Sequence, residues 1–376
     1  MTNGGSIYVH FPFCKRKCLY CAFYSVAGTK WREPYWNALC KEIELTKDYL
    51  PTKQIETLYF GGGTPSLCSA QELERIIEQI HKFYDFSENL EFTMEANPEQ
   101  LSDSYLKDIK KLGINRLSIG VQSFNDEILK LLKRGHTADE AHAAVEKASA
   151  AGFDNISIDL IYDIAYRTRE MWQHDLQMAL SLPVKHLSAY SLTVEENTLL
   201  ARQVREGKPF IHDDCDTERD YAILMELTQK AGFEQYEISN FAKGGAVSRH
   251  NSAYWTGQPY LGLGPAAHSY HSPVRKWNIA DIQRYIEGIE GENPSIEEEI
   301  LTKEMQYNEY VLLRLRTKNG VCLDEIVQLF GKDYADLFQK QLKNVNPKHY
   351  HNANGHIVLT YEGKLFADAV SAELFV

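Results

Sequence analysis

The sequence predicts an α/β protein: a partial (β/α)6 barrel followed by a small, mostly helical, winged-helix-like C-terminal domain. Short segments rich in β-branched and aromatic residues alternate with segments of 3.6-residue periodicity through the first half of the chain. Six such βα units in series imply a parallel sheet, and their number suggests a barrel or partial barrel. From about Leu301 the pattern becomes helical and then gives one short strand and a last helix.

Turn residues bound each predicted strand. The six strands are expected at 6–11, 57–60, 90–95, 116–120, 155–162 and 186–192, and the helices of this half at 69–84, 102–112, 137–151 and 169–182. Further along, the chain predicts a helix at 217–231, a strand at 236–241, an uncharged aromatic stretch at 251–274, a linker at 288–294 (GIEGENP), a strand at 355–360 and a helix at 364–374.

These patterns divide the chain into three expected regions. Residues 1–240 form the barrel, residues 241–290 a connecting segment and residues 291–376 the C-terminal domain. From Leu301 to Val376 there are nine Lys and Arg residues and nine Asp and Glu residues. This domain therefore lacks the basic face that DNA binding requires, and a lid or a partner surface is expected instead.

Composition excludes several classes of protein. With 44% hydrophobic and 24% charged residues, the 376-residue chain has the make-up of a globular protein. Its net charge of −12 argues against a nucleic acid as the main partner. No run of 18 apolar residues suggests an integral membrane segment, and the first residues do not resemble a secretion signal. A cytoplasmic location is expected.

Three of the seven cysteines fall within eight residues, as Cys14, Cys18 and Cys21 in a CxxxCxxC pattern after the first strand. Thiolates on so short a loop can converge on one metal centre. Three of them can hold a cubane iron–sulfur cluster and leave one iron open to another ligand. Structural zinc, with His10 as a fourth ligand, is the alternative.

Polar and glycine residues mark the carboxyl ends of the next strands. A glycine-rich turn, Gly61-Gly62-Gly63-Thr64-Pro65, follows the second strand, and glycines there let backbone groups approach a ligand. The later strands end in four polar residues, which are Glu95, Gln122, Asp159 and Ser191. In a barrel these ends form the active-site rim, although each residue could also be a local cap. Arg134 could neutralise a carboxylate or simply end a helix favourably.

The cysteine loop resembles the signature of the radical S-adenosylmethionine (SAM) superfamily. The resemblance implies a [4Fe–4S] cluster on Cys14, Cys18 and Cys21 and SAM at its open iron. It further implies a SAM site made by Gly62, Gly63, Thr64 and Glu95, with Tyr8 and Tyr20 nearby, completed by Gln122, Arg134, Asp159 and Ser191, which could also hold a second ligand.

The motifs YVHFPFC, FGGGTP, EANPE, LSIGVQSF, KRGHT, SIDLIY, HLSAYSLTVE and YEISNFA together resemble the oxygen-independent coproporphyrinogen III oxidase family. Its decarboxylating branch carries an N-terminal extension and a fourth cysteine two residues after the third. Here that position is Phe23, and thirteen residues precede Cys14. Both features resemble the other branch, the heme chaperones called HemW. One departure is the loop 162–167, where the family has Gly-Leu-Pro-Gly and this chain has neither glycine nor proline.

A second motif, His250-Asn251-Ser252-Ala253-Tyr254-Trp255, matches the HNxxYW pattern associated with heme in that branch. His250 is the expected axial ligand and His268 the second choice. Arg249, or Arg275 and Lys276, could meet a propionate. The alternative is a buried structural histidine in an aromatic-rich segment.

The resemblance implies a heme chaperone with a cluster and SAM, whose partners are heme, an unidentified acceptor protein and a low-potential electron donor. No residue is assigned a catalytic role. One rival is a radical SAM enzyme that decarboxylates coproporphyrinogen III. The other is a cluster-bearing redox or regulatory protein whose C-terminal domain contacts a partner.

Overall fold

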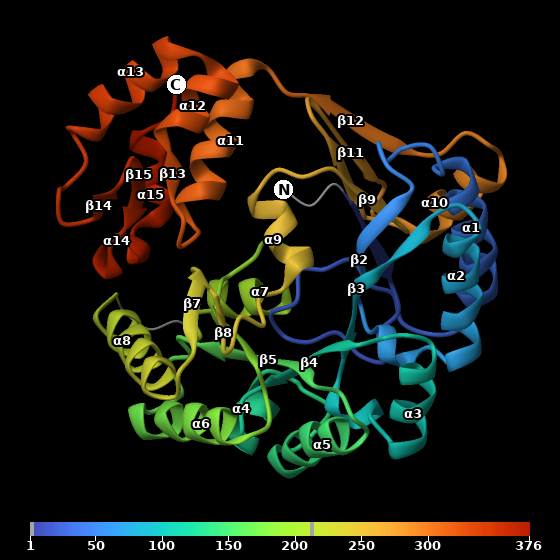
Figure 1. The fold of residues 1–376 in the computed structure, drawn as a ribbon. Coiled ribbons are helices and arrows are strands. Elements are labelled where there is room, and N and C mark those ends of the chain that lie inside the picture. Colours follow the sequence, from blue (N-terminus) through green and yellow to red (C-terminus); the bar gives the residue numbers. More distant parts are fainter. Residues whose placement is uncertain (1–3, 211–213) are drawn as a thin grey trace.

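The computed structural model describes residues 4–210 and 214–376. Twelve strands form one sheet in the order β12-β11-β10-β9-β1-β2-β3-β4-β5-β6-β8-β7. Strands β1 to β6 are parallel to one another, and β9 is also parallel to β1. These six strands curve into a partial barrel, and antiparallel strands extend it at both edges (Figure 1).

The strands of this sheet have the following bounds: β1 Gly5–Phe11, β2 Gln54–Gly62, β3 Asp85–Ala96, β4 Arg116–Gln122, β5 Asn155–Tyr162, β6 His186–Ser191, β7 Glu234–Glu237, β8 Asn240–Ala242, β9 Tyr260–Leu263, β10 His268–His271, β11 Val274–Asn278 and β12 Ile296–Ile300. The helices associated with it are α1 Arg32–Leu45, α2 Ala70–His81, α3 Asp103–Lys111, α4 Asp126–Leu131, α5 Ala138–Ala150, α6 Arg169–Ser181, α7 Leu199–Arg205, α8 Asp214–Lys230, α9 Arg249–Trp255 and α10 Ile282–Glu290. All six predicted barrel strands and the helices predicted between them are present.

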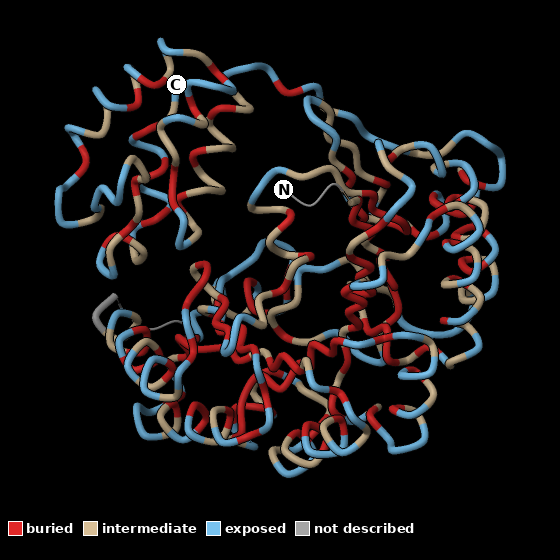
Figure 2. Tube along the Cα trace, viewed as in Figure 1, coloured by how far each residue is buried: buried red, intermediate tan, exposed pale blue. Residues whose placement is uncertain are grey.

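Helices cover the outside of the barrel, and the buried residues follow the strands (Figure 2). Alternation along the strands explains this arrangement. On β4, Leu117, Ile119 and Val121 belong to the apolar core beneath the helices. Arg116 and Ser118, which alternate with them, lie among the polar residues of the barrel interior. The face of β4 that points into the barrel is therefore polar, whereas the face beneath the helices is apolar.

Helix α9 lies in the middle of the ring of strands (Figure 1). Its first residues contact Thr57, in the amino-terminal half of β2, and Glu91, in the middle of β3. Thr57 pairs with Glu91 and with Ser6, which lies at the start of β1. It therefore closes the barrel at the end opposite the cysteine loop, and we call it the barrel floor. The predicted aromatic stretch 251–274 thus contributes part of α9, then β9 and β10.

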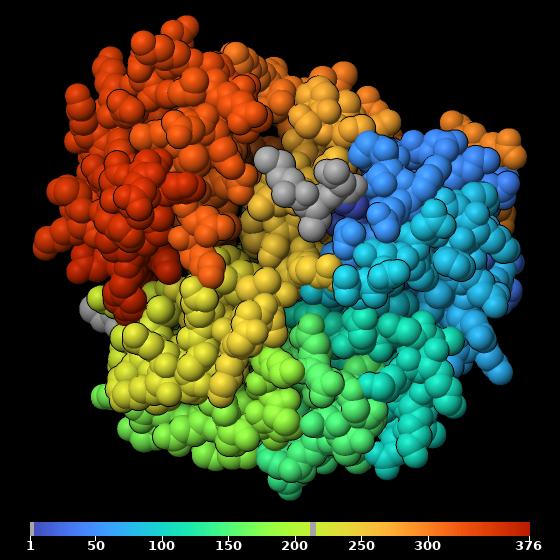
Figure 3. Space-filling model, viewed as in Figure 1, coloured from blue at the N-terminus to red at the C-terminus, as the bar shows by residue number. Residues whose placement is uncertain are grey.

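A separate apolar core holds the C-terminal module, which contains α11 Lys303–Leu315, β13 Val321–Cys322, α12 Leu323–Phe330, α13 Lys332–Leu342, β14 Tyr350–Ala353, β15 His356–Leu359, α14 Tyr361–Leu365 and α15 Ala367–Glu373. Helix, strand, two helices and a hairpin follow the order of a winged helix. This module packs against the segment around β7 (Figure 3), where the Lys318 amide donates to the Tyr236 carbonyl and Tyr221 stacks on Tyr361.

The predicted linker at 288–294 is wrong. Gly288 lies in α10, and the following residues turn the chain back into β12, which pairs with β11 in the large sheet. The sequence missed β12 because its acidic residues, Glu297 to Glu299, hide the strand pattern. Glu298 and Glu299 pair with Lys276 and Arg275 of β11. The domain division at residues 240 and 290 stays a prediction. No helix within the described residues is long and apolar enough to span a membrane.

Candidate functional site

The cysteine loop lies at the carboxyl end of β1, on the rim of the barrel. Its two ends are joined where the Cys14 amide donates to the Val26 carbonyl at 3.1 Å and the Val26 amide donates to the Pro12 carbonyl at 2.6 Å. Its middle is tied to the α4 end by the Leu19 amide, 3.2 Å from the Leu132 carbonyl. The loop is thus fixed by backbone contacts while Cys14, Cys18 and Cys21 keep partly exposed thiols.

Arg134 joins this loop to the rim of the sheet. Its guanidinium donates to the Cys18 sulfur at 3.2 Å, to the Asn97 side-chain oxygen at 2.6 Å and to the Gly120 carbonyl at 2.6 Å. Burial, with a smaller contribution from the neighbouring cysteines, raises the pKa of Cys14 and of Cys21. The loop supplies three thiols and Arg134 places a cation beside one of them, which are the residue types that suit an iron–sulfur cluster. Within 4–210 and 214–376 no three ligating side chains are already assembled around a common point.

The glycine-rich turn packs tightly against β1 and the cysteine loop. Gly62 has a φ of +103°, and a Cβ there would lie 2.6 Å from the His10 ring. A Cβ on Gly63 would lie 2.7 Å from the carbonyl oxygens of Phe11 and Phe13. Any side chain at Gly62 or Gly63 would collide with neighbouring protein atoms, so the packing of the protein requires glycine at both positions whether or not a ligand is bound. Thr64 follows with its hydroxyl 3.4 Å from the Cys14 sulfur.

Two carboxylates face the interior below the rim. Glu95 accepts hydrogen bonds from the Tyr59 hydroxyl at 2.9 Å and from the Gly62 amide at 3.0 Å, and burial raises its pKa to about 7. Asp159 accepts from the Ser118 hydroxyl at 3.2 Å, and burial also raises its pKa.

Five polar residues of the barrel interior and the cysteine loop keep accessible surface, which is 42% for Tyr190. They are Tyr8, Tyr20, Glu95, Asp159 and Tyr190. We call the space that these side chains border the barrel chamber. Its polar lining suits a polar or charged ligand.

Gln122 ends β4 in the left-handed region, with φ of +72°, after an irregularity in the pairing with β5. Its amide nitrogen would be 2.9 Å from a Cβ on Gly120, and an Arg134 nitrogen would be 3.2 Å from that Cβ. Gln122 and Arg134 therefore lie together over the Gly120 backbone.

Ser191 has a partner within the protein. Its hydroxyl donates to Asp163 at 2.8 Å, and Thr217 donates to the other oxygen of the same carboxylate at 2.8 Å. Asp163 has a φ of +64°, so it takes a conformation that normally favours glycine. In this loop the left-handed position is therefore occupied by a residue whose carboxylate engages Ser191.

His250 is 1% exposed, in the barrel floor. Its Nδ1 lies 2.8 Å from the Thr57 hydroxyl and its Nε2 lies 2.8 Å from the Tyr254 hydroxyl. In this arrangement neither nitrogen is free for an iron, so these residues do not fit heme without a rearrangement of α9.

The other residues expected near heme are also engaged, except one. Arg249 pairs with Glu56 at 3.4 Å and donates to the Asn89 carbonyl. Arg275 pairs with Glu299 and Glu309, and Lys276 pairs with Glu298. His268 is exposed, and its ring stacks on Trp277 with centroids 5.6 Å apart. It is the accessible imidazole of the two considered.

Arg116 is an interior residue that the sequence patterns did not single out. Its side chain is fully buried, its Nε has no hydrogen-bond partner, and the structure gives it no ion pair with any carboxylate in 4–210 or 214–376. Its charge is felt by Glu95 and Asp159, whose pKa values it lowers against the larger effect of burial. The signal available in the sequence was a charged residue at the start of a strand that has no other charged residue.

The chain is similar to known proteins over almost its whole length. Residues 8–179 match the profile of the Radical SAM superfamily, and residues 301–366 match the HemN C-terminal domain. The chain is 35% identical to "Heme chaperone HemW" of Lactococcus lactis, over 96% of this chain and 95% of that protein. It is 35% identical to "Heme chaperone HemW" of Bacillus subtilis, over 97% of each.

Among solved structures, the coproporphyrinogen III oxidase HemN of Escherichia coli, described as a radical SAM enzyme, matches with a TM-score of 0.83. The match covers 99% of this chain and 90% of that one at 22% sequence identity, so it shows a shared fold. The radical SAM fold implies a [4Fe–4S] cluster and SAM. With the near full-length similarity of its sequence to these relatives, the chain belongs to the heme chaperone HemW family of the radical SAM superfamily.

Proposed function

We propose that this protein binds heme and transfers it to acceptor proteins, with a [4Fe–4S] cluster and SAM at the barrel rim. The observation that carries the proposal is the match of almost the whole chain to proteins named heme chaperone HemW. Phe23, 66% exposed beside the cysteine loop, supports it, since the decarboxylating branch is expected to have a cysteine there.

For the cluster, we propose Cys14, Cys18 and Cys21 as ligands, with Arg134 balancing the thiolate charge at Cys18. For SAM, we propose the barrel chamber below it. Glu95 accepts from the ammonium group, Gly62, Gly63 and Thr64 form the wall at the methionine end, and Tyr8 and Tyr20 line the space. Gln122, Arg134 and Asp159 complete the chamber or hold a second ligand. When bound, a reduced cluster supplies the electron for SAM cleavage.

Ser191 is a weaker candidate for contact with SAM because its hydroxyl is engaged by Asp163. We assign it to the support of the 162–167 loop. This loop holds the carboxyl end of β5 and, through Arg167, is anchored to the Ile161 carbonyl at 2.7 Å.

Heme is proposed as cargo, with two imidazoles to distinguish. His250 requires release from the barrel floor, whereas His268 is accessible on β10 beside Trp277. We further propose a cytoplasmic location, an acceptor protein and a low-potential electron donor as partners.

The test is an anaerobic Soret titration of cluster-reconstituted protein, with His250→Ala and His268→Ala, followed by a coproporphyrinogen III assay on the same samples. We expect one heme per chain, loss of affinity in the variant that lacks the ligand, and no protoporphyrinogen IX. Absence of heme binding in the wild type contradicts the chaperone function, and protoporphyrinogen IX formed over several turnovers establishes the enzymatic alternative.

A further inference from the structure

We infer that His250 is a positioning residue for Glu95, acting through Tyr59, and that heme ligation by His250 and SAM binding at Glu95 therefore oppose each other. This rests on the proposed function, because it assumes that SAM meets Glu95. It goes further by joining the heme motif and the SAM site into one coupled unit.

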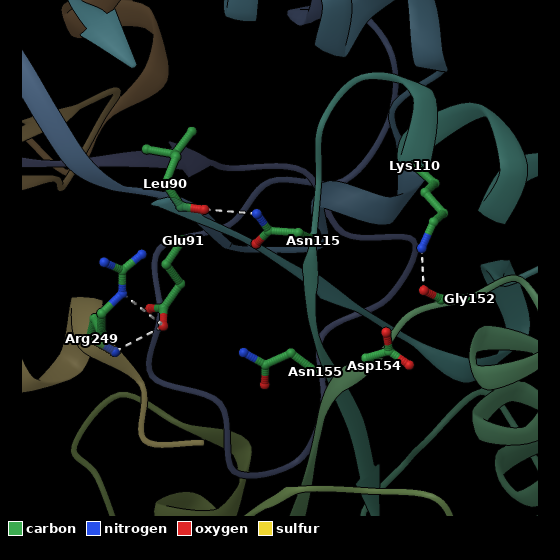
Figure 4. Close-up of a pocket in the computed structure, with 8 residues that line it drawn as sticks. All are labelled: Leu90, Glu91, Lys110, Asn115, Gly152, Asp154, Asn155 and Arg249. Carbon is green, nitrogen blue, oxygen red and sulfur yellow. Dashed lines mark hydrogen bonds and ion pairs between the residues drawn. The ribbon is translucent and has the colours of Figure 1, made fainter. Parts of the chain in front are cut away.

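The start of α9 is anchored to the barrel by a buried carboxylate. Glu91, 5% exposed, accepts from the backbone amides of Arg249 at 3.0 Å and His250 at 2.9 Å. The Arg249 guanidinium lies across the same carboxylate, and both line a cavity of about 370 Å³ at this end of the barrel (Figure 4). These contacts place His250 at a fixed point of the interior.

The His250 ring then supports the next layer. It stacks on the Tyr59 ring, with centroids 4.8 Å apart and planes at 27°. The Tyr59 hydroxyl donates to Glu95 at 2.9 Å, and the Gly62 amide of the glycine turn donates to the other oxygen at 3.0 Å. A chain of direct contacts thus leads from the floor through Tyr59 to the carboxylate proposed for SAM.

An iron can use an imidazole only through a nitrogen lone pair that it can reach. Both His250 nitrogens are engaged, by Thr57 and Tyr254. Heme must therefore displace at least one of them and draw the ring out of its stack. The Tyr59 ring then loses the stacking contact with His250. Its hydroxyl is no longer held in place as the donor that orients Glu95. Coupling between two binding equilibria is reciprocal, so bound SAM must weaken heme ligation by the same factor.

The first experiment uses wild-type protein with its cluster reconstituted. The dissociation constant of SAM is measured by anaerobic equilibrium dialysis without heme and with saturating heme. We expect SAM to bind about five- to tenfold more weakly with heme, in the usual range for coupled sites. Equal affinities in the two states overturn the inference.

Two substitutions separate positioning from simple loss of structure. His250→Ala removes the ring and is expected to weaken SAM binding by a similar factor. His250→Phe keeps a flat ring against Tyr59 but has no nitrogen for iron; it is expected to restore SAM affinity, whereas any ligation of heme by His250 is lost. A merely structural role predicts that Phe, which leaves two hydroxyls without a partner, is no better than Ala, and that result overturns the inference.

Two controls distinguish this inference from the proposed function. His142→Ala, on α5 outside the barrel, must leave SAM affinity unchanged. Glu95→Gln must weaken SAM binding. If it does and His250→Ala does not, only the coupling fails; if Glu95→Gln also binds SAM as the wild type does, the proposed SAM site fails and the coupling with it.

Discussion

The two ends of the barrel both carry polar side chains that can bind a ligand, but they differ in how far the protein itself already engages these side chains. At the rim, the three cysteines are partly exposed, and Glu95 and Asp159 keep accessible surface in the barrel chamber. At the floor, His250 has both nitrogens bonded and is buried. The rim residues are therefore accessible to a ligand, whereas the hydrogen-bonding groups of His250 in the floor are already bonded to protein side chains. A histidine in a binding motif can be structural when its partners are supplied from distant strands.

The largest expected effect concerns the rim. Replacing Cys14, Cys18 or Cys21 by Ala should abolish cluster binding, because three thiolates are the minimum set on this loop. Iron and sulfide analysis should give close to four of each per wild-type chain and little in each variant. Cys40→Ala, on α1, is the control and should retain the cluster. Stoichiometric zinc in the wild type would instead favour the zinc alternative.

At the floor, the largest effect should follow loss of Glu91. Glu91→Ala leaves two amides of α9 without their acceptor in a buried place and should lower the free energy of unfolding by about 3 kcal/mol. Urea unfolding measures this. Glu88→Ala, an exposed acid on the same strand, should change stability by less than about 0.5 kcal/mol. Similar values for the two variants would mean that the floor is not anchored in this way.

Glu95 should matter for ligand binding rather than for the cluster. Loss of a charge-assisted hydrogen bond to an ammonium group costs about 1.5–3 kcal/mol, so Glu95→Ala should weaken SAM binding by about 10- to 100-fold. Equilibrium dialysis gives the affinity, and iron content should be unchanged. An unaltered SAM affinity would remove Glu95 from the site.

The same carboxylate predicts a pH dependence. Burial raises the Glu95 pKa to about 7, so its neutral form predominates below that pH and cannot pair with an ammonium group. SAM affinity should therefore rise as pH increases from 6 to 8, by up to about tenfold. In Glu95→Gln this rise should be absent. A rise that persists in that variant would assign the titration to another group.

The smallest expected effect tests Ser191. Because its hydroxyl serves Asp163, Ser191→Ala should cost about 1 kcal/mol of stability and leave SAM affinity unchanged. Thermal unfolding and equilibrium dialysis measure the two quantities. A loss of SAM affinity without loss of stability would return Ser191 to the ligand site, as the sequence predicts.

Local patterns in the sequence determined much of this protein. The six barrel strands, the helices between them and the cysteine loop can be read from it because each depends on neighbouring residues: alternation, periodicity and the spacing of three thiols. The carboxyl ends of parallel strands meet at one rim, so the sequence also suffices to group Glu95, Gln122 and Asp159. It does not suffice for strand β12, since the acidic residues of that strand make sense only beside the basic residues of β11.

The tertiary structure alone decided which polar groups remain available. His250 is satisfied by Thr57, 193 residues away, and its helix is anchored by Glu91, 159 residues away. The closure of the barrel encloses the Arg116 side chain and leaves its Nε without a hydrogen-bond partner. Ser191 is engaged by Asp163, a residue that lies on the preceding strand's loop. Hydrogen-bond satisfaction depends on contacts across the whole fold, and no local pattern records them.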